Sequence, residues 1–248
     1  MFKKTSPFIF IFALISFTAL VCFFLAESID FNHSEKIVAA FVMFFFGFLS
    51  VFFACQKIVS QAKRKKWMKA AFIAFFVLYF IMFLNFTLMD GTFGRKVSSI
   101  FLLDAAQIRE YVKTNTNLTP FATVKIFAAA YNEGTLSMST IIENILGNLF
   151  ILAPFSLFAP CAFKGMNKPV NFFVFCCILV SAVELLQFVF MTGSADIDDF
   201  ILNILGAIVT YWLLNIGTFK RFVSGLTLGL FGGEENENSG KRQNKSHA

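Results

Sequence analysis

Charge is scarce in this sequence. Only 15% of its 248 residues are Asp, Glu, Lys or Arg, against about 25% in soluble domains. The hydrophobic share is high, at 57%, and these residues fall in long blocks instead of recurring at the intervals of a soluble core. This composition excludes a soluble enzyme built on one core, and it excludes a disordered chain. A polytopic membrane protein remains.

Glycine, proline, cysteine and histidine are also few. Fourteen Gly and five Pro exclude a collagen-like chain, and five Cys in or beside apolar blocks exclude a secreted disulfide scaffold. The only His residues, His33 and His247, lie away from the polar motifs of the chain, which has no nucleophile elbow, His-Glu-x-x-His or phosphate-binding glycine loop. These absences favour a non-enzymatic protein without catalytic residues or a cofactor, and they leave a metal site open.

Apolar sequence is abundant and includes 38 Phe. Six blocks are long enough for a helix to cross a bilayer core of about 30 Å. They cover residues 8–26, 37–55, 70–89, 141–163, 169–191 and 199–219. The first block resembles a signal peptide, but its apolar run is long and its cleavage site poor, so we interpret it as a retained span. The predicted fold is an all-α transmembrane bundle of about six spans.

The basic residues indicate how this bundle is oriented. With a cytoplasmic N-terminus, 15 of the 21 Lys and Arg fall in segments predicted to lie inside. The positive-inside rule therefore predicts that both termini are cytoplasmic in a multi-pass protein of the cell membrane. Lys63-Arg64-Lys65-Lys66 borders a span, which favours a topological anchor over a nucleic-acid or anionic-lipid site. Membrane lipids are expected partners, nucleic acid is not, and the oligomeric state stays open.

Four regions follow from these boundaries. They are three N-terminal spans in 1–89, an extracellular segment in 90–140, a core with three spans in 117–219, and a cytoplasmic, partly disordered tail in 220–248.

The extracellular segment has the pattern of two amphipathic helices. Val97, Phe101, Ala105, Ile108 and Val112 recur at helical spacing. A second helix is predicted to begin at Thr119-Pro120, with the Thr as N-cap and the Pro at the first helical position. We expect both helices to lie on the outer membrane surface or over the mouth of the bundle.

The last three spans contain polar residues that lipid does not tolerate well. Thr140 and Glu143 match a capping box, which accounts for Glu143, and Asp196 is placed to cap the sixth span. Most of the other polar residues fall at one depth, in the outer third of the membrane. The candidate pocket residues are Asn144, Asn148, Ser181, Glu184, Gln187, Asp196, Asp198, Asp199 and Asn203.

Two interpretations of this polar set stay open. One is a hydrogen-bond network that holds three helices together, with Gly147 and Gly206 allowing close approach. The other, which we favour, is an outward-facing intramembrane pocket that binds a headgroup, a cation or an extracellular ligand. Glu184 is the strongest single candidate, since a carboxylate deep in a span is costly unless it faces a cavity or a partner.

Four motifs in order along the chain resemble the VanZ-like family. They are Asn117-Leu-Thr-Pro120-Phe121, Asn144-Ile-Leu-Gly-Asn148 with Pro154, Ser181-Ala-Val-Glu184-Leu-Leu-Gln187, and Asp196-Ile-Asp-Asp199 followed by Asn203 and Gly206. The resemblance covers about 117–215 and implies a link to tolerance of glycopeptide antibiotics, especially teicoplanin-type molecules, at the bacterial cell envelope.

The chain departs from the family pattern in two places. Many members carry a Gly-Arg pair before the Asp-rich motif, where this sequence reads Thr192-Gly-Ser-Ala195, so an anion-binding role for that Arg is absent or relocated. The second and third spans look like an addition to a shorter family core.

Three functions are therefore compared. The first is a non-enzymatic envelope factor that lowers access of a lipoglycopeptide to its target. The second is a membrane enzyme acting on a lipid-linked cell-wall intermediate, with paired carboxylates as acid and base or as ligands of Mg²⁺. The third is a transporter of lipids or small molecules, which an interrupted span near Gly147 and Pro154 would support.

Overall fold

The computed structural model describes residues 33–56, 58, 60–88 and 98–232, with side chains from residue 42 onward. The predicted first span, 8–26, lies outside these residues, as does most of the predicted tail. The described chain is helical apart from one pair of two-residue strands, as the sequence predicted for the fold class.

Four helical segments are long and apolar enough to cross a membrane. They are α3 (Gln61–Leu88), the pair α6 (Met138–Phe150) and α7 (Phe155–Ala162), α8 (Pro169–Val189) and α9 (Ile197–Leu214). They correspond to the predicted third to sixth spans. The predicted second span lies within α2 (His33–Gln56), of which 42–56 is a shorter apolar helix.

The end of the last span differs from the prediction. Helix α9 stops at Leu214, and a separate helix, α10 (Gly217–Leu226), follows where the sequence analysis placed the end of the span and the start of the tail. Helix α10 places Lys220 and Arg221 beside exposed Phe219 and Phe222. This mixture of basic and aromatic residues is typical of a helix at a membrane interface.

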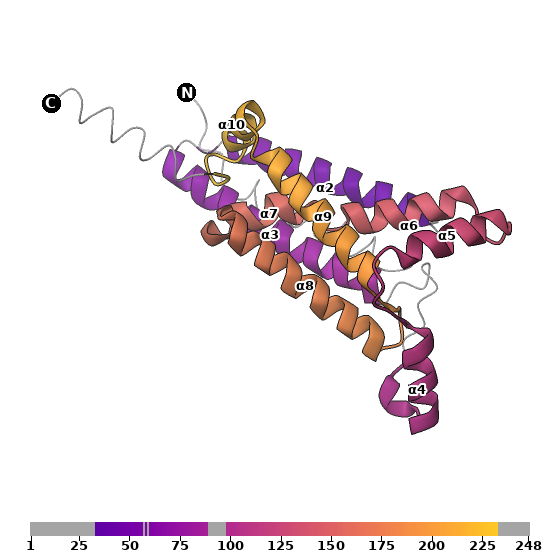
Figure 1. The fold of residues 1–248 in the computed structure, drawn as a ribbon. Helices are drawn as coiled ribbons and strands as arrows, with labels where there is room; N and C mark the ends of the chain where they lie inside the picture. Colours follow the sequence, from indigo (N-terminus) through magenta and orange to yellow (C-terminus); the bar gives the residue numbers. More distant parts are fainter. Residues whose placement is uncertain (1–32, 57, 59, 89–97, 233–248) are drawn as a thin grey trace.

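The fourth span is interrupted. Between Ala153 and Leu157 the backbone N–H groups bond to the carbonyl oxygen three residues earlier, as in a 3-10 helix, and not to the one four residues earlier. Pro154 lies in this stretch and has no backbone N–H to donate. Tyr79 on α3 donates its hydroxyl to the carbonyl oxygen of Ile151 at 2.6 Å, which satisfies a group at the break. Helix α6 then packs on α9 and α7 packs on α3, and the two helices are separately labelled in Figure 1.

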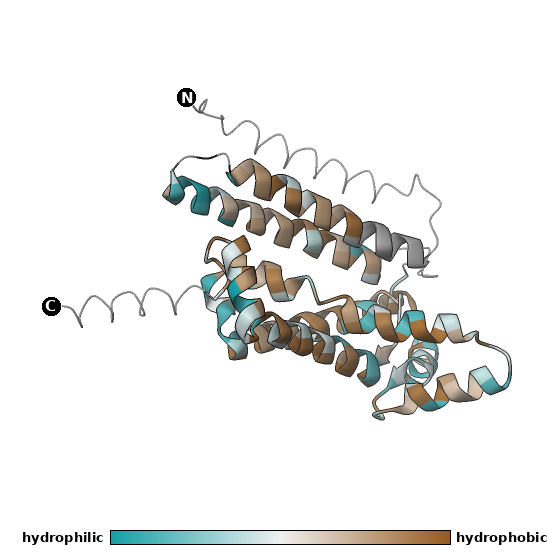
Figure 2. Ribbon diagram, turned by 90° about the horizontal axis from the view of Figure 1, so that it is seen from above, coloured by the Kyte–Doolittle hydropathy of each residue, from teal (hydrophilic) through white to brown (hydrophobic). Residues whose placement is uncertain are grey.

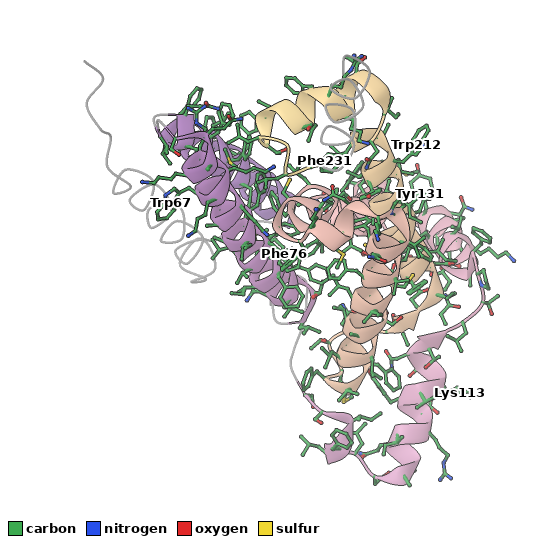
Figure 3. The ribbon with its side chains drawn as sticks, turned by 90° about the vertical axis from the view of Figure 1, so that its left-hand side faces the viewer. Trp67, Phe76, Lys113, Tyr131, Trp212 and Phe231 are labelled. Carbon is green, nitrogen blue, oxygen red and sulfur yellow. The ribbon has the colours of Figure 1, made fainter. Side chains whose placement is uncertain are left out.

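Aromatic rings form much of the core between α2, α3 and α7. Phe155 contacts Tyr79 at a ring-centroid distance of 5.0 Å, and Phe44 contacts the same Tyr at 5.4 Å, both edge to face. Figure 3 shows Phe76 where α3 faces α7 and α8, in ring contact with Phe155 at 5.4 Å. Such pairs are favourable beyond the area they bury, which gives the high Phe content a packing role.

The segment between α3 and α6 folds over one end of the bundle. It contains η2 (Ile100–Leu102), α4 (Ala105–Thr114), β1 (Thr116–Asn117) and α5 (Ala122–Asn132). The predicted first helix starts later than expected, since Leu103 is extended and Asp104 caps α4 in a box with Gln107. Val97 lies outside the described residues.

Helix α4 is attached to the end of α8. The Tyr111 hydroxyl donates to the carbonyl oxygens of Phe188 and Gly193, each at 3.2 Å. Partial burial raises the pKa of Tyr111, so its hydroxyl remains a donor at neutral pH. This contact attaches α4 to the loop between α8 and β2 (Ala195–Asp196).

The two ends of the bundle differ in charge. Among the described residues, one end carries nine Lys and Arg on the start of α3, around η3 (Lys164–Asn167) and on α10, with no Asp or Glu. Helices α4 and α5 lie at the other end (Figure 1). Figure 2 shows hydrophilic residues, in teal, at the ends of long helices that are brown along their middle.

Candidate functional site

Helices α6 and α9 meet through the predicted polar residues. The Asn148 amide donates to the Asp199 carboxylate at 2.5 Å, and the Asn203 amide donates to the Asp199 carbonyl oxygen at 2.7 Å. A side chain at Gly206 would place its Cβ 1.6 Å from the carbonyl oxygen of Leu149. The predicted close approach at Gly206 is therefore present. The one expected at Gly147 is not, since nothing lies within 4 Å of a Cβ built there.

Helix α8 contributes Glu184 and Gln187. The buried Gln187 amide donates to the carbonyl oxygen of Thr87 at 2.9 Å, which joins α8 to the last turn of α3. The Glu184 carboxylate accepts the backbone N–H of Asp196 at 3.5 Å. Ser181 lies on an exposed part of α8, because it is rotated about 100° from Val180, which faces the bundle. It is not grouped with the other two residues.

Asp196 and Asp198 have a structural role instead. Asp196 caps α9 by accepting the N–H of Asp198 at 2.9 Å, as predicted. It also accepts the Asn117 amide at 3.1 Å and the Thr123 hydroxyl at 2.7 Å. Strand β1 pairs in parallel with β2 (Ala195–Asp196) beside these contacts. Asp196 thus attaches the segment between α3 and α6 to the start of α9.

Asp198 completes this attachment. Its carboxylate is buried and accepts the backbone N–H groups of Phe121 at 2.5 Å and Thr123 at 2.8 Å. Phe121 has φ of 65° and precedes α5, which begins at Ala122. The prediction that Thr119 caps a helix starting at Pro120 is therefore wrong, because a carboxylate from α9 takes the N–H groups that a local cap would satisfy.

The predicted capping box at the start of the fourth span is also wrong. Ser137 caps α6 and accepts the backbone N–H of Thr140 at 3.2 Å, so the helix begins three residues earlier than predicted. Glu143 therefore lies within the second turn of α6 and not three residues after the N-cap. It lines the cavity described next.

A cavity of about 820 Å³ lies among α2, α3, α6, α7, α8 and α9. Six of the nine candidate residues line it, namely Asn144, Asn148, Glu184, Gln187, Asp199 and Asn203. Ser181, Asp196 and Asp198 do not. Further polar lining comes from Thr87, Glu143 and Thr210. The volume is typical of sites that hold small molecules.

The rest of the lining is apolar and largely aromatic. Phe44, Phe45 and Phe48 come from α2, and Tyr79, Phe83 and Phe86 come from α3. Sequence reasoning missed these residues because one Phe in a uniformly apolar span looks like any other. Only Tyr79 and Thr87, as polar residues in an apolar run, offered a signal.

The charged residues of the lining are acidic. Among the described residues that line the cavity, Glu143, Glu184 and Asp199 are acids, and none is Lys, Arg or His. Within the part of the chain that the structure describes, no three His, Cys, Asp or Glu come close enough together to hold a metal ion. The three carboxylates come from three helices, α6, α8 and α9.

Comparison with known proteins agrees with the motifs. No curated protein and no solved structure matches the chain. The family model described as VanZ/LLP1 matches residues 76–218, more than half of the chain. The match starts inside α3 and so includes most of the third span, which the sequence analysis had treated as an addition to the family core. The chain belongs to the VanZ/LLP1 family.

Proposed function

We propose that this protein is a multi-pass factor of the cell envelope that binds an amphiphilic molecule in its outward-facing cavity and thereby lowers susceptibility to teicoplanin-type glycopeptides. The observation that carries the proposal is the cavity of about 820 Å³, in which polar residues of α6, α8 and α9 face aromatic residues of α2 and α3. A purely structural network would fill this space with side chains. Membership of the VanZ/LLP1 family supports the link to glycopeptides.

The charge distribution supports an outward-facing site. The basic end, formed by the start of α3, η3 and α10, fits the cytoplasmic side under the positive-inside rule. Much of the polar lining lies towards the other end, with Thr87 and Gln187 in the last turns of α3 and α8 and Asp199 and Asn203 in the first two turns of α9. A ligand reaching the outer face of the membrane would meet these groups first.

The proposal is tested by teicoplanin susceptibility in cells with and without the gene. We expect Glu184→Ala and Asp199→Ala to return susceptibility to the level of cells lacking the gene, because each removes a carboxylate from the cavity wall. Ser181→Ala is the matched control, since Ser181 is exposed on the same helix as Glu184 and does not line the cavity. Membrane levels of each variant are measured in parallel, and full protection by both Ala variants at normal levels would disprove the role of the cavity.

Transport of the bound amphiphile is the second candidate function. The specific observation in its favour is the interruption between α6 and α7, since discontinuous spans border the binding sites of many transporters. Movement of a labelled amphiphile between the leaflets of liposomes separates the two functions, because simple binding produces no such movement.

A further inference from the structure

The basic end of the bundle contains a second, smaller pocket. Its volume is about 380 Å³, and the described residues that line it are Gln61, Arg64 and Lys65 of α3 and Leu228 of the turn that follows α10. The two basic residues belong to the run Lys63-Arg64-Lys65-Lys66. A topological signal requires positive charge at the border of a span, but it does not require a pocket, so the shape of this site needs a separate explanation.

Arg64 is held in place by neutral groups. Its Nε and Nη2 atoms donate to the carbonyl oxygen of Ile58 at 3.1 and 2.9 Å, and its Nη1 atom donates to the side-chain oxygen of Gln56 at 3.1 Å. These bonds fix the guanidinium but do not neutralise it. They use three of its five N–H groups, so within the described part of the chain two are left for a ligand oxygen. A planar guanidinium in a fixed position is well suited to bind a phosphate.

The opposite wall of the pocket is a turn whose shape is also fixed. Thr227 is fully buried, and its hydroxyl accepts the backbone N–H of Phe231 at 3.3 Å. At the end of the turn, the side-chain oxygen of Asn167 in η3 accepts the backbone N–H of Gly232 at 2.6 Å. The turn is therefore attached to the bundle at both ends, and it holds Leu228 against the start of α3.

Lys65 reaches from α3 to this turn. A Cβ built on Gly229 would lie 4.0 Å from the Lys65 Nζ atom. The ammonium of Lys65 and the guanidinium of Arg64 thus flank one pocket, although they are consecutive in the sequence. A phosphate group matches such a pair, because its several oxygens can accept charge-assisted hydrogen bonds from two cations at once.

Helix α10 places this pocket at a membrane surface. Its Val223 is buried, whereas Phe219 and Phe222 are 48% and 60% exposed and stack with their ring centroids 6.3 Å apart. Exposed aromatic residues on a short basic helix are typical of an element that lies in the interfacial plane. Because α10 ends at Leu226, two residues before Leu228, the pocket lies at the level of the lipid headgroups.

We propose that this pocket binds the phosphate of one anionic phospholipid headgroup, with the acyl chains of the lipid in the bilayer beside α10. Arg64 and Lys65 would bind the phosphate oxygens. A lipid is the source of the phosphate because the membrane surface supplies tethered anionic headgroups at high local concentration. The site lies at the opposite end of the bundle from Gln187 and Asp199, so it is independent of the proposed function.

The test measures how lipids quench the fluorescence of Trp67. The full-length protein with Trp212→Phe, in nanodiscs, contains Trp67 as its only Trp. Trp67 lies three residues after Arg64, which is about one turn of α3. Quenching by brominated phosphatidylglycerol is compared with quenching by brominated phosphatidylcholine. We expect a preference for the anionic lipid of at least about fivefold, and a ratio near one would overturn the proposal.

Two double variants separate the pocket from general attraction by the basic end. Arg64→Gln with Lys65→Gln should remove most of the preference, because it removes both charges that line the pocket. Lys66→Gln with Lys69→Gln is the matched control, since it removes two charges from exposed positions of the same helix outside the lining. An equal loss of preference in the two double variants would overturn the site.

A single variant guards against disruption of the chain around Arg64. Lys65→Gln leaves the hydrogen bonds of Arg64 to Ile58 and Gln56 in place. It should still lower the preference for phosphatidylglycerol at least about twofold. A preference equal to that of the native sequence would show that Lys65 does not contact the headgroup and would overturn the proposal.

Two other occupants of the pocket are outcomes of the same assay. Glu234, Glu235 and Glu237 follow Gly232 closely in the sequence and lie outside the described residues. If the preference appears only when all three are replaced by Gln, the acidic stretch of the chain occupies the pocket and the lipid proposal is wrong. Inorganic phosphate should leave the preference unchanged, because it has no acyl chains. Loss of the preference in equimolar phosphate would indicate a site for a soluble anion instead.

Discussion

At the scale of single residues, Gly206 has no space for any side chain. A Cβ at this position would overlap the backbone of Leu149 on the neighbouring helix, and a backbone atom cannot rotate away as a side chain can. Gly147 has space for a side chain, since a Cβ there meets nothing within 4 Å. The two glycines therefore differ in the space around them, although both lie in spans that contain polar residues.

We predict that Gly206→Ala lowers the unfolding free energy by on the order of 3 kcal/mol, because α6 and α9 must move apart. Gly147→Ala should be neutral or stabilising by about 0.5–1 kcal/mol, since Ala is the better helix former. Thermal unfolding of the two purified variants in detergent provides the measurement. Equal midpoints for both variants would contradict the close approach at Gly206.

The same scale shows which polar residues could be identified from sequence. Asn148, Glu184, Gln187, Asp199 and Asn203 stand out because they are polar residues within spans, and these do line the cavity. Asp198 has the same appearance in the sequence but is held by Phe121 and Thr123, more than 70 residues away along the chain. Composition and spacing contain no information about a partner at that distance.

At the scale of elements, the acidic start of α9 accepts hydrogen bonds from the segment between α3 and α6. Asp198 holds the N-terminal end of α5, and Asp196 holds β1 through Asn117. The family resemblance in Asn117-Leu-Thr-Pro120-Phe121 thus has a physical account, since Asn117 supplies the amide that Asp196 accepts and Phe121 supplies a backbone N–H that Asp198 accepts.

We predict that Asp198→Ala releases this attachment without unfolding the spans. Charge-assisted hydrogen bonds contribute about 1.5–3 kcal/mol each, so amide hydrogen exchange at residues 117–125 should accelerate more than tenfold. Exchange in α8 should stay unchanged. Asp104→Ala is the control, because Asp104 caps α4 alone and its loss should affect residues 105–108. Unchanged exchange at 117–125 would show that Asp198 is not the anchor.

The helices themselves were predictable, but their ends and partners were less so. Apolar length located α8 closely, since the predicted span 169–191 compares with Pro169–Val189. Helix α3 begins at Gln61, well before the predicted 70, and α9 ends at Leu214, before the predicted 219. The starts of α5 and α6 were misplaced because a distant carboxylate and an earlier Ser take the capping roles. The Phe residues of α2 and α3 carried no local signal for the cavity, since which face of an apolar helix meets a neighbour depends on long-range packing.

At the scale of the whole molecule, the charge difference between the ends makes a prediction about topology. In a background without the native cysteines, Lys66→Cys at the start of α3 should react with an impermeant maleimide only after cells are permeabilised. Lys113→Cys on α4 should react in intact cells. Figure 3 places Lys113 far from Trp67, the neighbour of residue 66. The reversed pattern would place the polar end of the cavity in the cytoplasm and would remove the basis for an outward-facing site.

The pairing of β1 with β2 has a consequence for how the molecule assembles. Asn117 and Asp196 are 79 residues apart, and α5 to α8 lie between them. Synthesis runs from the N-terminus, so β1 leaves the ribosome long before its partner strand exists. The segment that contains β1 and α5 must therefore stay undocked while α6, α7 and α8 are made, and the start of α9 then closes the loop. Helix α5 can dock only after the start of α9 has been made, because Asp198 accepts the N–H groups of Phe121 and Thr123. The acidic motif therefore acts at a late stage of folding.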